Sequence, residues 1–233
     1  MPRMTRKLVV EAIGTFFLVL TIGLLLTSSH PTALAPLVIG SVLMIMVYAG
    51  GHISGAHYNP AVTIAVFLRG KAASRDIAGY WAAQVIGAVA ASLVTKLVFA
   101  ETNPQPALLD LAYAGIAEFI FTFALAYVVL NVATTKGTEG NSYYGLAIGF
   151  TVMVGAFTVG GISGGVFNPA VAISIAILGL APWSAVPVYL VANFAGAAAA
   201  GFLFRALDLG NDKPTTATAR QQAVLSPAAS TGR

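Results

Sequence analysis

Six long apolar segments, separated by short polar connections, make up most of this chain of 233 residues. An α-helix needs about 20 apolar residues to cross the hydrocarbon core of a bilayer. The pattern therefore predicts an all-α membrane protein with six transmembrane helices, at about 7–27, 34–51, 76–99, 111–133, 142–160 and 182–206.

Two shorter apolar pieces lie at about 59–69 and 168–178. They are too short to span a bilayer, and their length of about 10 to 14 residues is typical of re-entrant segments. Beyond the sixth span, residues 210–233 are rich in Ala, Thr and Ser and show no apolar periodicity. This composition predicts a disordered tail after one membrane domain over 1–209.

The composition agrees with a lipid environment. Charged residues make up 9% of the chain, whereas a soluble domain carries about 25%. The chain has no cysteine, which excludes disulfides, thiolate metal sites and cysteine nucleophiles. No Ser-His-Asp set, phosphate-binding loop or acid pair stands out, so we expect neither an enzyme nor a bound cofactor.

The net charge of +4 is interpreted as a signal of membrane orientation and not of nucleic-acid binding. With six spans, eleven of the twelve basic residues fall on one side: Arg3, Arg6, Lys7, Arg69, Lys71, Arg75, Lys136, Arg205, Lys213, Arg220 and Arg233. Only Lys96 lies near the other side. The positive-inside rule then predicts that both termini are cytoplasmic, in a protein integral to the plasma (inner) membrane.

The second half of the chain repeats the first. The stretch ISGAHYNPAVT at 53–63 matches ISGGVFNPAVA at 162–172. Glu11 precedes the first copy and Glu118 precedes the second at a similar distance, and the stretches YWAAQVIGA and YLVANFAGA follow them. A repeat of this length predicts two related structural halves.

Each half, about 7–99 and 111–206, contains three spans and one re-entrant piece. Because three is an odd number, the two halves are predicted to lie in the membrane with opposite orientations. Inverted repeats with interrupted helices place their special site near the midplane, where the repeats meet.

An Asn-Pro-Ala triplet stands at the centre of each repeat, formed by Asn59, Pro60 and Ala61 and by Asn168, Pro169 and Ala170. Asparagine is a favoured helix N-cap and proline is favoured at the first helical position, so each triplet predicts a helix start. The asparagine oxygen caps the first turn, which leaves its NH₂ group free to donate into a cavity. Two such half-helices aim two positive dipole ends at one point, which repels cations.

The glycine-rich approaches GGHISGA and GGISGG predict irregular backbone. Irregular backbone at membrane depth is tolerated where it lines a water-filled cavity, and its carbonyl groups supply a row of acceptors. Donors at the centre and acceptors along the approach favour a path for small neutral polar molecules.

Paired NPA triplets, the stretch HISGAHYNPAVT, the AQVIG of the third span and a glutamate in the first span of each half resemble the aquaporin, or major intrinsic protein, family. The resemblance covers about 5–206. It implies an aquaporin-like channel domain with six tilted helices and two re-entrant half-helices, one pore per subunit, and a homotetramer in the lipid bilayer.

The family narrows its pore at a four-residue selectivity filter. Offsets from the triplets place this filter at Ile39, Ala156, Gly165 and Val171. The family usually has arginine at the position of Val171, and its glycerol-conducting members usually have aspartate at the position of Ala172. All four filter residues here are apolar, which predicts a wide apolar opening. A shift of one residue would put Phe157 in place of Ala156 and tighten it.

The expected function is therefore a passive channel for small uncharged solutes, such as glycerol, urea, ammonia or neutral metalloid acids, together with water. Without the arginine, cation exclusion would rest on the half-helix dipoles and the asparagine pair. One alternative is an ordinary water-selective aquaporin. A more distant one is a secondary transporter, since transporters also use inverted repeats and broken helices.

Four further polar residues lie in or beside the spans. Glu11 and Glu118 are intramembrane carboxylates, and such groups are functional candidates by default. Their matching places in the repeat favour a structural role, in which each accepts hydrogen bonds from loop backbone beside its NPA segment. His57 is expected to line the cytoplasmic half of the pore. His52 and His57 lack further ligands nearby, so no metal site is expected.

Overall fold

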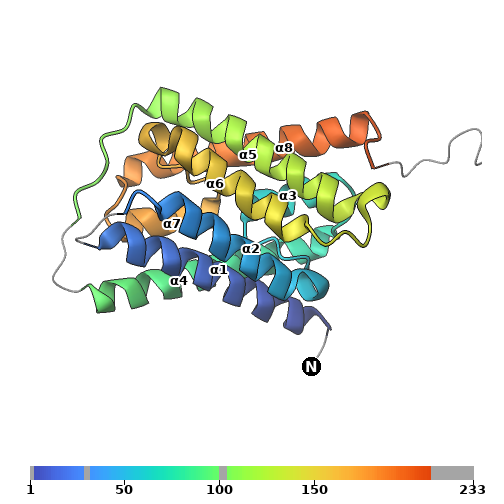
Figure 1. Cartoon of the computed structure of the whole chain (residues 1–233), viewed down its shortest axis with the longest axis horizontal. Coiled ribbons are helices and arrows are strands. Elements are labelled where there is room, and N and C mark those ends of the chain that lie inside the picture. Colours follow the sequence, from blue (N-terminus) through green and yellow to red (C-terminus); the bar gives the residue numbers. More distant parts are fainter. Residues whose placement is uncertain (1–2, 29–31, 100–103, 211–233) are drawn as a thin grey trace, which may run out of the picture.

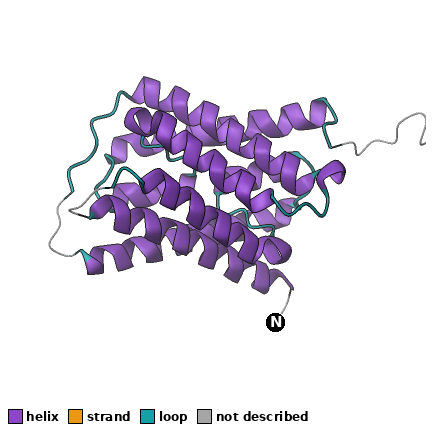
Figure 2. Cartoon of the chain, in the orientation of Figure 1, coloured by secondary structure: helices purple, strands orange, loops and turns teal. Residues whose placement is uncertain are grey.

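The computed structural model describes residues 3–28, 32–99 and 104–210, and these residues form helices and connections without a strand (Figures 1 and 2). Six helices are long and apolar enough to cross a membrane, which confirms the predicted number. They are α1 (Arg3–Thr27), α2 (Ala35–Ser54), α4 (Ser74–Val98), α5 (Leu111–Thr134), α6 (Tyr144–Ser163) and α8 (Val186–Ala206). The predicted tail lies outside the described residues except for Gly210.

Two short helices, α3 (Pro60–Leu68) and α7 (Pro169–Ile177), follow the two NPA asparagines. Both begin at proline, as the sequence predicts. Two single turns, η1 (Lys136–Thr138) and η2 (Trp183–Ala185), complete the described elements. Helix α2 extends beyond its predicted end and stops at Gly55, and α6 does the same at Gly164, because these glycines adopt the left-handed C-cap conformation that favours glycine.

Equivalent helices of the two repeats make equivalent close contacts. Helix α1 packs against α4, α5 against α8, and α2 against α6. A side chain at Gly87 would strike the backbone carbonyl of Ala12, and one at Gly196 would strike that of Phe119. Between α2 and α6, Gly40 and Gly149 face each other's backbone. Small residues allow this close approach, so the same device closes the bundle in both halves.

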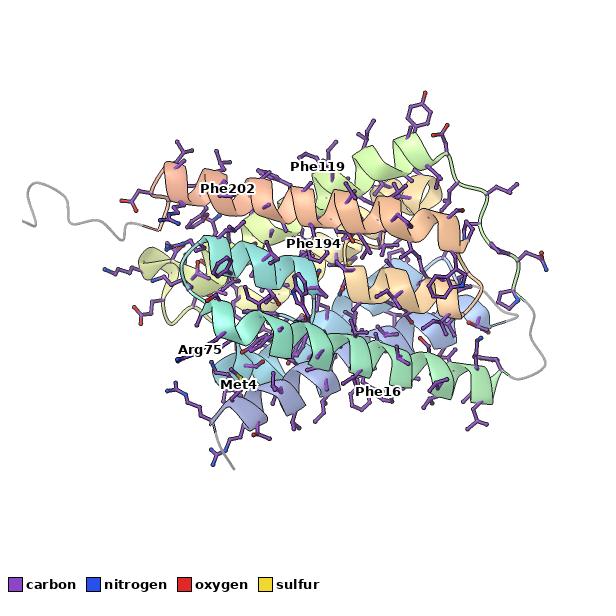
Figure 3. The ribbon with its side chains drawn as sticks, turned by 180° about the vertical axis from the view of Figure 1, so that it is seen from behind. Met4, Phe16, Arg75, Phe119, Phe194 and Phe202 are labelled. Carbon is purple, nitrogen blue, oxygen red and sulfur yellow. The ribbon has the colours of Figure 1, made fainter. Side chains whose placement is uncertain are left out.

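The outer surface of the bundle is apolar. Figure 3 shows the rings of Phe119 and Phe202 on this surface, and their exposed fractions are 38% and 59%. Exposed aromatic and aliphatic side chains on this scale suit contact with lipid tails. The start of α1, the start of α4 with Arg75 and the end of α8 lie at one end of the bundle (Figures 1 and 3).

Candidate pore and its centre

The two half-helices meet at their N-terminal ends inside the bundle. The Oδ1 atom of Asn59 accepts the backbone N–H of Ala61 at 2.9 Å, and that of Asn168 accepts the N–H of Ala170, also at 2.9 Å. Both asparagines are buried, with 4% of their surface exposed. Each side chain therefore caps its own half-helix.

The asparagine NH₂ groups also tie the repeats together, which the sequence did not predict. Asn59 Nδ2 donates to the carbonyl of Phe167 at 2.8 Å, and Asn168 Nδ2 donates to the carbonyl of Tyr58 at 2.9 Å. An NH₂ group has two protons, so one proton of each is used in this exchange. The sequence analysis left both protons of each NH₂ group free to donate into the cavity. In the structure, one proton of each asparagine remains free for this.

The carbonyl groups of Tyr58 and Phe167 are oriented by an uncommon backbone conformation. Tyr58 and Phe167 have φ angles of +48° and +47°, in the left-handed region that non-glycine residues rarely adopt. Such a residue costs about 1–3 kcal/mol and persists only where its surroundings fix it. The strained residue directly precedes the asparagine in both repeats. The repetition indicates that this backbone conformation is needed to bring the two asparagines and the opposite carbonyl groups together.

Two buried glutamates hold the strained loops. Glu118 is fully buried and accepts four hydrogen bonds. They come from the Ser163 hydroxyl (2.7 Å), the backbone N–H groups of Val166 (2.8 Å) and Phe167 (2.6 Å), and Asn193 Nδ2 (2.9 Å). All four are charge-assisted bonds if the carboxylate is ionised, and such bonds are stronger than neutral ones.

Glu11 does the same in the first repeat. It accepts hydrogen bonds from Ser54, from the backbone N–H groups of His57 and Tyr58, and from Gln84. The sequence analysis pointed to both glutamates, but it did not identify Gln84 and Asn193 as their partners. Gln84 follows Asn59, and Asn193 follows Asn168, at the same distance in the sequence. This correspondence could have identified the two amides as equivalent partners of the glutamates.

A narrow cavity of about 40 Å³ runs past the two asparagines, and we call it the central cavity. One water-sized probe needs roughly 10–15 Å³, so the cavity suits a short file of water-sized molecules. Three of the four predicted filter residues line it: Ile39, Gly165 and Val171. Further aliphatic side chains, which the sequence analysis missed, also line it: Leu18, Ile22, Leu43, Ala56, Val62, Leu125, Val129, Ile148, Val152 and Val166.

Ala156 does not line the central cavity. It lies against Gly165, where an added Cβ would come within 3.0 Å of the Ala156 Cα. Val152, one turn earlier on α6, faces the cavity in its place. Phe157, the alternative filter residue, has 54% of its surface exposed and is not among the lining residues.

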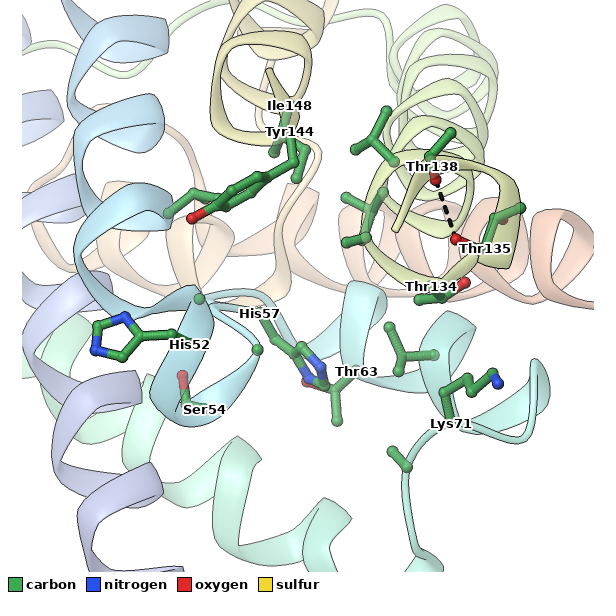
Figure 4. Close-up of a pocket in the computed structure, with 18 of the residues that line it drawn as sticks. His52, Ser54, His57, Thr63, Lys71, Thr134, Thr135, Thr138, Tyr144 and Ile148 are labelled. Atoms are coloured by element: carbon green, nitrogen blue, oxygen red, sulfur yellow. Dashed lines mark hydrogen bonds between the residues drawn. The ribbon is translucent and has the colours of Figure 1, made fainter. Parts of the chain in front are cut away.

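A second cavity of about 770 Å³ opens at the end of the bundle that carries the start of α1. We call it the vestibule (Figure 4). Its charged lining consists of Lys7, Lys71, Asp76, Lys136 and Glu139. The connection after α5 covers part of it and is fixed by side-chain bonds to helix carbonyls, from Thr138 Oγ1 to Asn131 (2.6 Å) and from Asn141 Nδ2 to Val132 (2.8 Å).

His57 lies where the two cavities join, because it lines both. Its Nδ1 atom is 3.1 Å from the hydroxyl oxygen of Thr63, and its ring centroid is 5.0 Å from that of Tyr80. Burial lowers the pKa of the His57 imidazole below its ordinary value of 6.5. No group of three or more metal-ligating side chains occurs among the described residues.

Comparison with known proteins agrees with this architecture. The model of the family described as "Major intrinsic protein" matches residues 2–204 and, in a second match, 114–232. The chain is 36% identical to "Aquaporin NIP1-4" of Oryza sativa subsp. japonica, over 89% of this chain and 79% of the relative. It is 32% identical to "Nodulin-26" of Glycine max, over 94% of this chain and 84% of that protein.

One solved structure shows the same fold. The X-ray structure of the aquaglyceroporin from Plasmodium falciparum has a TM-score of 0.76 to this chain and covers 89% of it, and 99% of that structure is matched. The two sequences are 22% identical, so this likeness concerns the arrangement of the helices and not the solute.

Proposed function

The chain belongs to the major intrinsic protein family, and from this premise we propose that it is a passive channel for small uncharged polar solutes. The proposed solutes are glycerol, urea, ammonia or neutral metalloid acids, together with water. Membership of the family establishes an integral membrane channel of the aquaporin type. The range of solutes is the new part of the proposal.

The observation that carries the proposal is the apolar character of the central cavity. Its side chains are aliphatic apart from the two asparagines, His57 and two aromatic residues of the loops, and none of the described lining residues is cationic. A fixed charge in a low-dielectric pore binds polar solutes strongly and repels like charges. With Val171 in the place of a cation, size and polarity decide passage.

The sites follow from this reading. Asn59 and Asn168, with the prolines and alanines that follow them, form the pore centre and offer one N–H each to a passing solute. Of the predicted selectivity filter, Ile39, Gly165 and Val171 line the opening, while Ala156 packs behind Gly165 and Val152 takes its place in the wall. Glu11 and Glu118 serve a structural role.

The proposed setting is a homotetramer of the channel domain of 1–209, with both termini in the cytoplasm. The orientation is supported by the basic residues: all those described except Lys96 belong to elements and connections at the vestibule end. The vestibule would then face the cytoplasm.

Substitution of Val171 tests the filter. Stopped-flow light scattering on proteoliposomes is expected to show glycerol and urea permeability in the unmodified chain. Val171→Arg is expected to remove it, because the guanidinium fills and charges the opening, while Val171→Leu adds bulk without charge and retains part of it. Unchanged glycerol flux in Val171→Arg would show that Val171 is not in the filter.

An ordinary water-selective aquaporin is the second candidate. The small volume of the central cavity favours it, since about 40 Å³ suits water more easily than glycerol. The same experiment separates the two functions. Fast water flux without glycerol or urea flux in the unmodified chain would support the water channel.

A further inference from the structure

The two repeats differ in polarity beside the pore at two matching positions. His57 and Thr63 of the first repeat correspond to Val166 and Ala172 of the second. His57 lines both cavities, whereas the second repeat has an aliphatic side chain at the matching position. A network of hydrogen bonds surrounds His57, and the direction of each bond can be assigned.

The assignment starts at Glu11. Its two carboxylate oxygens accept the backbone N–H groups of His57 (2.9 Å) and Tyr58 (2.7 Å), one each. A backbone N–H can only donate, so both oxygens act as acceptors. Gln84 lies 2.9 Å from Glu11 Oε2. Gln84 must therefore present its NH₂ group and not its oxygen.

Gln84 passes this direction on to Thr63. Its Nε2 atom also lies 3.1 Å from Thr63 Oγ1, so the threonine oxygen accepts. The single hydroxyl proton of Thr63 is donated to the carbonyl of Asn59 at 3.1 Å, a bond that threonine commonly makes to the residue four earlier in a helix. With that proton used, the 3.1 Å contact between Thr63 Oγ1 and His57 is made by a proton on Nδ1.

The neutral imidazole then has a bare Nε2 atom, which is an acceptor. Within the described part of the chain Nε2 has no hydrogen-bond partner, and it is not among the buried polar atoms that lack one. In the opposite arrangement Thr63 donates to Nδ1 and gives up its bond to the Asn59 carbonyl. The network would then contain one hydrogen bond fewer.

The second repeat provides an internal comparison. Asn193, the counterpart of Gln84, is shorter by one methylene and donates to Glu118 (2.9 Å) and to Thr122 (3.0 Å). In the first repeat, the hydroxyl of Thr15, the counterpart of Thr122, has no partner among the described residues. Gln84 is longer and donates to Thr63 instead. The extra methylene therefore allows the amide to reach the hydroxyl group that contacts His57.

We propose that Thr63 is a positioning residue that holds His57 with its proton on Nδ1, so that Nε2 accepts a hydrogen bond from solutes with an O–H or N–H group. The consequence for transport rests on the proposed function as a solute channel, whereas the position of the proton does not. A solute that donates to Nε2 next meets the donors of Asn59 and Asn168. The path therefore selects molecules that both donate and accept hydrogen bonds.

Solid-state NMR of the full chain in lipid, labelled with ¹⁵N-histidine, tests the position of the proton. The sequence contains three histidines, and a His57→Gln variant identifies the signals of His57. At neutral pH we expect the proton on Nδ1 in the wild type and in Thr63→Ser, and loss of this preference in Thr63→Val. A proton on Nε2 in the wild type would overturn the proposal. Thr63→Ala serves as the folding control, because Ala172 occupies the same place in the second repeat.

Transport of two amides tests the consequence. Formamide has N–H groups and N,N-dimethylformamide has none, and empty liposomes give the background for each. We expect Thr63→Val and His57→Val to lower the permeability of formamide relative to N,N-dimethylformamide about fivefold, the value of one ordinary hydrogen bond, and Thr63→Ser to restore the ratio. An equal loss for both amides would refute the selection by Nε2. If the NMR result holds but the wild type passes neither amide, the proposed function fails and the assignment of the proton stands.

Discussion

Replacement of Glu118 by glutamine perturbs the most densely bonded side chain of the pore. One carboxylate oxygen accepts hydrogen bonds from Ser163 and the backbone of Val166, and the other accepts from Asn193 and the backbone of Phe167. Glutamine has the same shape but presents NH₂ at one of these two places. Whichever way the amide turns, one backbone N–H then faces another donor.

The expected loss of stability can be estimated from these contacts. A buried donor without an acceptor costs about 1–3 kcal/mol, and a bond to a charged acceptor is worth more than one to a neutral acceptor. The Asn193 amide and the Ser163 hydroxyl can turn to reduce the conflict, but the backbone cannot. We therefore expect Glu118→Gln to lower the free energy of unfolding by about 2–4 kcal/mol, a large part of a total of about 5–15 kcal/mol.

Thermal unfolding in detergent, followed by circular dichroism and by size-exclusion chromatography, measures the effect. Glu139→Gln is the matched control, because Glu139 is exposed in the connection after α5. We expect a clear drop in melting temperature for Glu118→Gln and none for the control. If the two variants melt together with the wild type, the four hydrogen bonds to Glu118 do not hold the second NPA loop and the argument is refuted.

Two further predictions follow from the helix crossings and from His57. Gly149→Val places a side chain against the carbonyl of Gly40 and is expected to cost about 1–3 kcal/mol by overpacking, whereas Gly160→Val, with no atom within 4 Å of its added Cβ, is the control in the same melting assay. Because the pKa of His57 is lowered from 6.5, the ring is neutral at pH 7, so solute permeability is expected to stay constant from pH 8 to about 6.5 and to change only in more acidic solution. The measurement is the pH dependence of solute permeability by stopped-flow light scattering. A transition with its midpoint above pH 6.5 that is lost in His57→Gln and kept in His52→Gln would contradict the lowered pKa of His57.

The sequence alone predicted the helices well because their signals are local. Apolar length identifies a span, and Asn-Pro identifies the start of a short helix; α3 and α7 begin at Pro60 and Pro169 accordingly. The ends of α2 and α6 were predicted too early, since paired glycines suggest a break. Both helices continue to the residue before Gly55 and Gly164, where the left-handed backbone ends them.

The walls of the pore were harder to predict because lipid and pore lining use the same aliphatic residues. Leu18 and Leu43 line the central cavity, while Leu97 and Val191 on the outside are mostly exposed, and nothing local distinguishes the two groups. The bonds from Asn59 and Asn168 to the opposite loops join residues about a hundred positions apart. They depend on the strained backbone of Tyr58 and Phe167, which only the folded chain reveals.

The ratio of glycerol to water permeability, measured by stopped-flow light scattering on proteoliposomes of the unmodified chain and corrected for empty liposomes, tests the central claim most directly. The apolar filter predicts glycerol flux well above background that rises linearly with the gradient. Water flux with glycerol at background, or solute flux that saturates and depends on an ion gradient, would contradict the proposed solute channel.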